Sequence, residues 1–91
     1  MAPQPGASPT PGQEAAPLSN GQKAFLEQVT AADAQAGANE SALDFGRGIC
    51  LDTEQGMTDA QVTRNAAARF SVDNATARTI VKAARAHLCA K

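Results

Sequence analysis

Residues 45–50 read FGRGIC and contain the first of only two cysteines in this 91-residue sequence. The second, Cys89, stands close to the C-terminal end. A bond between Cys50 and Cys89 would close most of the second half of the chain into one loop. The rest of the domain would have to fold around that closure.

The composition favours helices over strands. Aromatic residues make up 3% of the chain, as three Phe with no Trp or Tyr, whereas alanine is abundant. Alanine is the strongest helix former, and aromatic residues are typical of strands. The length allows one domain, and a core of this size is often too small without a covalent staple or a metal. We therefore expect a single, small, all-α domain.

The first 17 residues differ in character from the rest. They contain all five prolines, and proline removes amide donors and favours an extended backbone. This segment is predicted to be a disordered tail and spacer, followed by a helical domain over residues 18–91. It lacks the basic and apolar regions of a signal peptide, so we expect either a cytosolic chain or one whose export signal stood before Met1 and was removed. No apolar run in the sequence is long enough to cross a bilayer.

Two helices are predicted in the first half of the domain. One spans about residues 20–36: Ser19 and Gln22 have capping-box spacing at its start, and Gly37 is a natural stop. The next spans about residues 41–55 and carries one apolar stripe that includes Cys50. Gly46 lies on that stripe without a side chain, which predicts close packing of a partner helix.

Two further helices are predicted after Gly56, which suits the left-handed position that ends a helix. Thr58 and Gln61 form a second capping box that starts a helix over about residues 59–70. The last helix spans about residues 73–89, with Ser71 or Asp73 as its cap. The four helices are expected to form a small bundle. Its inner residues are predicted to be Phe25, Val29, Ala32, Ala36, Ala42, Phe45, Ile49, Val62, Ala66, Ala67, Phe70, Ala77, Ile80, Val81, Ala84 and Leu88.

The formal net charge is −1, which gives no support to nucleic acid or a membrane surface as a partner. The charge is unevenly spread: residues 1–56 carry seven acidic and two basic side chains, and residues 57–91 carry two acidic and six basic ones. Arg78, Lys82 and Arg85 gather on one flank of the last predicted helix. With His87 they form the interaction surface that the sequence suggests, although a solvated helix face is the plainer interpretation.

No catalytic or metal site can be assembled from the sequence, so we expect a protein that is not an enzyme and has no cofactor. His87 is the only histidine, and the spacing of the two cysteines fits neither a Cys₂His₂ zinc site nor a redox pair. A structural disulfide and two independent free thiols remain. The even cysteine count and the place of Cys50 on a core-facing stripe favour a disulfide with Cys89, and disulfides imply export.

Three short motifs lie along the predicted helical part of the sequence: Gly46-x-x-x-Cys50, Gly56-x-Thr58-x-x-x-Val62 and Ile80-Val81-x-x-Ala84-x-x-x-Leu88-Cys89. With these motifs the sequence resembles domain-of-unknown-function family 732, a group of small actinobacterial proteins that are mostly exported. The resemblance covers about residues 22–89. It implies secretion and a helical fold with paired cysteines, and it implies no activity.

Three hypotheses follow. The first, which we favour, is an exported, non-catalytic, monomeric helical module that is secreted or associated with the cell envelope and binds a protein or an envelope component. The second is a carrier of a small apolar ligand, or of haem, held between helices near Gly46 and His87. The third is a cytosolic interaction module that uses the basic last helix and requires free thiols.

Overall fold

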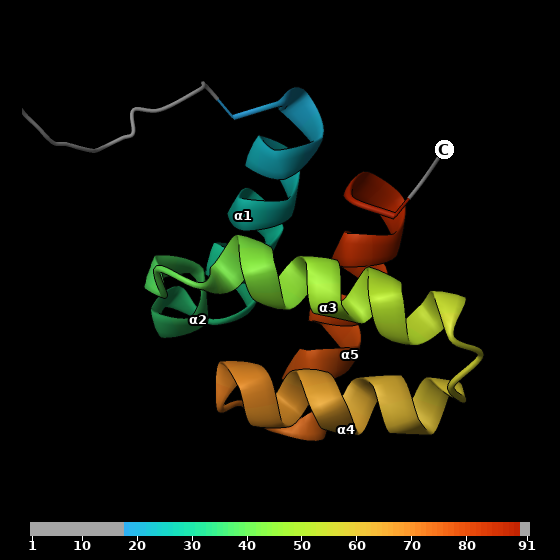
Figure 1. Cartoon of the computed structure of the whole chain (residues 1–91). Coiled ribbons are helices and arrows are strands. Elements are labelled where there is room, and N and C mark those ends of the chain that lie inside the picture. Colours follow the sequence, from blue (N-terminus) through green and yellow to red (C-terminus); the bar gives the residue numbers. More distant parts are fainter. Residues whose placement is uncertain (1–17, 90–91) are drawn as a thin grey trace, which may run out of the picture.

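The computed structural model describes residues 18–89, so the predicted tail over residues 1–17 lies outside the described part. The described residues are helical and contain no strand, which confirms the all-α prediction. The helices, shown in Figure 1, are α1 (Asn20–Ala32), α2 (Ala34–Ala38), α3 (Ala42–Glu54), α4 (Asp59–Phe70) and α5 (Asn74–His87).

Helix α5 is the centre of the arrangement. Figure 1 shows α3 and α4 running antiparallel to each other, with α5 crossing behind both of them. Helix α5 contacts α1, α3 and α4, and the short α2 packs against α1 and α3. The core therefore gathers around one face of α5, which carries the buried Ile80 and Ala84. The opposite face, with Arg78 and Lys82, is exposed to solvent.

The first predicted helix differs from the observed structure. In place of one helix over residues 20–36, α1 ends at Ala32 and α2 begins at Ala34. Asp33 between them is extended, with φ of −160°, and its carboxylate accepts a hydrogen bond from the Ala36 amide at 3.0 Å. An aspartate that caps a new helix competes with continuation of the old one. The described residues thus form five helices instead of four, and Gly37, the predicted stop, lies inside α2.

The predicted capping motifs of α1 and α4 are confirmed. Ser19 accepts from the Gln22 amide at 3.1 Å, and the Gln22 side chain accepts from the Ser19 amide at 2.8 Å. Thr58 and Gln61 make the same reciprocal pair at the start of α4. Gly56 has φ of +84°, the left-handed conformation expected after α3. These short-range signals fix where α1 and α4 begin.

The start and end of α5 also follow local chemistry. Asp73 is the cap, and it accepts from the Thr76 amide at 2.7 Å. That hydrogen bond lowers the pKa of Asp73 from its ordinary value, because it stabilises the ionised carboxylate. The helix ends at His87, earlier than predicted, and the amide of Cys89 turns back to the carbonyl of Ala84.

Every buried apolar residue of the described part except Ala83 was predicted to be an inner residue, whereas Ala32, Phe45, Ala67 and Leu88, also predicted, are only partly buried. Helix α1 contributes Phe25 and Val29, and the ring of Phe70 meets that of Phe45 edge to face, with centroids 5.2 Å apart. Alanines make up much of the remainder, which lets the helices approach closely. The buried apolar residues are Phe25, Val29, Ala36, Ala42, Ile49, Val62, Ala66, Phe70, Ala77, Ile80, Val81, Ala83 and Ala84.

Candidate functional site

The two cysteines form a disulfide, as predicted. The Sγ atoms of Cys50 and Cys89 lie 2.03 Å apart, and their Cα atoms 5.3 Å apart. The bond joins α3 to the turn that follows α5. It therefore holds the C-terminal end of α5 against α3.

Gly46 lies where α1 and the end of α5 press onto α3. A Cβ atom at this position would fall 2.5 Å from Cδ1 of Leu88 and 2.9 Å from the ring of Phe25. The space over Gly46 is therefore already occupied by two side chains of the protein itself. This is the region in which the sequence suggested room for a small apolar ligand.

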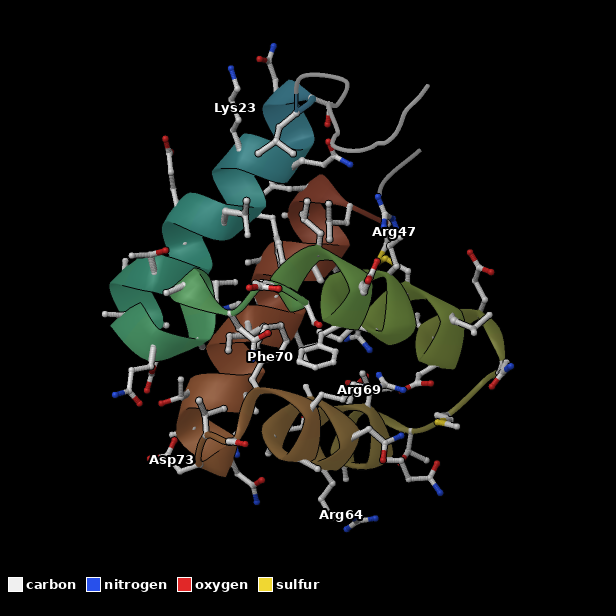
Figure 2. The ribbon with its side chains drawn as sticks, turned by 60° about the vertical axis from the view of Figure 1, so that its left-hand side comes forward. Lys23, Arg47, Arg64, Arg69, Phe70 and Asp73 are labelled. Atoms are coloured by element: carbon white, nitrogen blue, oxygen red, sulfur yellow. A yellow bond between two sulfur atoms is a disulfide. The ribbon has the colours of Figure 1, made fainter. Side chains whose placement is uncertain are left out.

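A buried carboxylate joins α3 to α4. Asp52 is only 4% exposed, and it accepts a hydrogen bond from Nη1 of Arg69 at 3.0 Å and one from the side-chain Nδ2 of Asn65 at 3.2 Å. Figure 2 shows Arg69 extending from α4 toward α3. Gly48 makes room for the guanidinium, since a Cβ there would meet Nη1 of Arg69 at 2.7 Å. We call Asp52, Asn65 and Arg69 the Asp52 cluster.

A groove with a volume of about 480 Å³ runs between α4 and α5. Val81 and Thr63 are both buried and form its floor, and charged side chains stand at its edges. Figure 2 shows Arg64 on the side of α4 opposite Arg69, so the groove and the Asp52 cluster lie on different sides of that helix. The groove is lined by Asp59, Ala60, Thr63, Arg64, Asn74, Arg78, Val81, Lys82 and Arg85.

Four of the lining side chains are cationic, and one is acidic. Arg85 pairs with that acid: its Nη2 lies 3.0 Å from Oδ1 of Asp59. Its Nε is buried without a hydrogen-bond partner. Within residues 18–89, no carboxylate forms an ion pair with Arg64, Arg78 or Lys82. The groove therefore carries a local excess of positive charge.

The structure brings together three of the four residues of the predicted interaction surface. Arg78, Lys82 and Arg85 line the groove, whereas His87 does not. The Nε2 atom of His87 lies 2.9 Å from the side-chain nitrogen of Gln28, which places His87 against α1. Sequence reasoning missed Arg64, because its place in the groove depends on how α4 packs against α5.

The groove has the chemistry of an anion-binding surface with an apolar floor. Guanidinium groups bind carboxylates and phosphates through paired hydrogen bonds, and lysine adds a mobile point charge. Among residues 18–89, no three His, Cys, Asp or Glu side chains gather in a way that could hold a metal ion. Over the same residues, no helix is long and apolar enough to cross a membrane.

Together, the fold and the disulfide define a small, all-helical, disulfide-bonded domain. A family model described as "Protein of unknown function (DUF732)" matches residues 21–91, and the chain belongs to this family. The family resemblance found in the sequence is thereby confirmed. Neither the curated proteins nor the solved structures yield a match to this chain.

Proposed function

We propose that this chain is an exported, non-catalytic binding module that recognises a protein or a component of the cell envelope. The observation that carries the proposal is the disulfide between Cys50 and Cys89. Structural disulfides form and persist in oxidising compartments and are rare in the cytosol. A small domain held by a disulfide is typical of proteins that work outside the cell.

A binding role fits the surface better than catalysis does. The groove between α4 and α5 is a concave surface with the buried Val81 and Thr63 at its floor and charged groups at its edges, which is how ligand sites are commonly built. The side-chain partner of the one histidine is Gln28 of α1, and not a carboxylate or a nucleophile of the kind that a catalytic histidine needs.

The two alternatives receive less support. A cytosolic interaction module requires free thiols, whereas Cys50 and Cys89 are bonded. A carrier of a small apolar ligand, or of haem, needs space near Gly46, where the side chains of Phe25 and Leu88 lie. We therefore keep both as alternatives of lower rank.

The test combines thiol trapping with binding. Cells that produce the natural protein would be treated with an alkylating agent, fractionated, and the intact mass of the protein measured with and without reductant. We expect the protein outside the cytoplasm, unalkylated and two hydrogens lighter than its reduced form. We also expect the purified oxidised protein to bind the isolated envelope fraction, or secreted proteins of the same cells, saturably. A cytoplasmic protein with two alkylated cysteines would contradict the proposal.

A further inference from the structure

We propose that the groove between α4 and α5 binds a short acidic segment of a partner protein. The carboxylates of that segment would lie between Arg64, Arg78 and Lys82, and one of its apolar side chains would rest on Val81. This inference rests on the proposed function, because it names the surface and the partner chemistry of the same binding module.

The spacing of the cations suits a peptide. Arg78 and Lys82 are four residues apart on α5, so they stand about 6 Å apart along that helix. Arg64 stands on the facing helix, α4. A segment that enters the groove therefore meets positive charge on both sides. Between these walls, Val81 is 4% exposed and Thr63 is 8% exposed, which provides a floor for an apolar side chain.

The charge distribution decides between a short segment and a long polyanion. Arg85 is neutralised by Asp59, which leaves three cations without an acidic partner in the part of the chain that the structure describes. The 91-residue chain nevertheless carries a formal net charge of −1. An extended polyanion or an anionic membrane would reach beyond the groove and meet the acidic remainder of the surface. A short acidic peptide meets only the groove.

The acidic residue in the groove favours the same partner. Asp59 is exposed at one end of the groove, beside Arg85. A uniformly negative ligand would be repelled by this carboxylate, whereas a peptide can place a neutral or apolar residue beside it. A peptide with both acidic and apolar side chains thus matches the lining better than a phosphate chain does.

Direct binding measurements test the inference. The oxidised full chain would be titrated against a fluorescent peptide of about 12 residues containing glutamate and leucine, a length that spans the groove in a helical or an extended form. Three probes would be compared with it: the same peptide with serine in place of leucine, single-stranded DNA, and vesicles of phosphatidylglycerol. We expect saturable binding of the glutamate–leucine peptide, and weaker binding of all three other probes.

Charge-reversal variants locate the site. Lys82→Glu should weaken peptide binding about tenfold, because it removes a charged partner and adds a repulsive one. The matched control is Lys23→Glu, which makes the same charge change at an exposed position of α1. Figure 2 shows Lys23 at the far end of the molecule from Arg64. The control should change binding less than about twofold, since screening limits charge effects at that range.

The outcomes separate this inference from the proposed function. It is overturned if Lys23→Glu weakens peptide binding as much as Lys82→Glu does, or if DNA or the vesicles bind as tightly as the peptide. It is also overturned if the serine peptide binds equally well, since the floor of the groove would then contribute nothing to binding.

A second set of outcomes distinguishes the groove from the proposed function. If the envelope fraction binds wild type and Lys82→Glu alike, the groove is not the binding site and the proposed function stands. A cytoplasmic protein with free thiols that still binds the peptide through Lys82 would instead contradict the proposed function and support the groove. Circular dichroism of each variant confirms that the helices are retained.

Discussion

Helix α4 carries two arginines, one on each side, that differ in their ion pairing. On one side, Arg69 reaches toward α3 and pairs with the buried carboxylate of Asp52. On the other side, Arg64 lines the groove beside α5 and pairs with no carboxylate among residues 18–89. Arginine therefore stabilises the packing of α4 against α3 on one side, and on the other side it leaves in the groove a positive charge that no described carboxylate pairs with.

The helix that each arginine faces explains this difference in ion pairing. Helix α3 presents an acid and a glycine to Arg69, so the guanidinium is matched in charge, and Gly48 leaves room for it. Helix α5 presents more cations to Arg64. Buried charges without a partner are strongly destabilising, whereas exposed ones cost little. The unmatched cations accordingly stand where water can reach them, at the edges of the groove.

The largest effect on both regions should come from loss of the disulfide, because the Asp52 cluster and the groove both lie inside the loop that it closes. Replacing both Cys50 and Cys89 with alanine should lower the free energy of unfolding by roughly 4 kcal/mol on the chain-entropy estimate for a loop of this length. Urea denaturation would measure it, with the reduced wild type as a second route to the open loop. A fall of less than about 1 kcal/mol would show that the helices hold together without the bond.

The next effect would separate the two sides of α4. Arg69→Ala removes the ion-pair partner of Asp52 and leaves a buried carboxylate with only the side-chain Nδ2 of Asn65 as a donor, which should cost about 3 kcal/mol of unfolding free energy. Lys82→Ala in the groove should change it by no more than about 0.5 kcal/mol. Thermal and urea unfolding measure both. Equal losses of unfolding free energy in the two variants would show that the ion-paired side of α4 and the groove side contribute alike to stability.

A smaller change would test the fit of the guanidinium against α3. Gly48→Ala adds a Cβ against Nη1 of Arg69 and should destabilise the protein by about 1 kcal/mol, despite the better helix propensity of alanine. In an Arg69→Ala background, the same change should stabilise it by about 1 kcal/mol, because only the propensity remains. A double-mutant cycle from urea unfolding provides the measurement. Additive effects would show that Gly48 and Arg69 are independent.

The smallest effect concerns acid stability at the start of α5, next to the end of the groove. The pKa of Asp73 is lower in the folded protein than in the unfolded chain, because the Thr76 amide stabilises its carboxylate. This contribution is fully present above the unfolded pKa and is lost as the pH falls through the folded pKa. Asp73→Asn keeps a capping acceptor and removes the titration. Its unfolding free energy should therefore fall less steeply with acid than that of wild type; parallel curves would exclude Asp73 as a contributor.

Much of the fold could be predicted because its signals are local. The capping boxes at Ser19 and Thr58 depend on residues three positions apart, and Gly56 needs only its own backbone conformation. The apolar stripes follow the helical period, so they predict the core almost completely. The division at Asp33 was missed because an apolar face continues through Ala36, which stays buried after the break.

The candidate site was less predictable because it depends on distant packing. Arg78, Lys82 and Arg85 share a flank of one helix, which the period reveals, whereas Arg64 joins them only through the way α4 packs against α5. His87 is near them in sequence and yet faces α1. Asp52 was missed for a similar reason: nothing in its own segment shows that Arg69, 17 residues later, will cover it.

The two faces of α5 also bear on how such a domain diversifies. Ile80 and Ala84 bury one face in the core, whereas Arg78 and Lys82 are exposed on the other. Both side chains are exposed and form no ion pair within residues 18–89, so a change of charge at either position leaves the buried core unchanged. Under the proposed function, such a change would alter which partner the groove accepts while the disulfide-bonded framework stays the same.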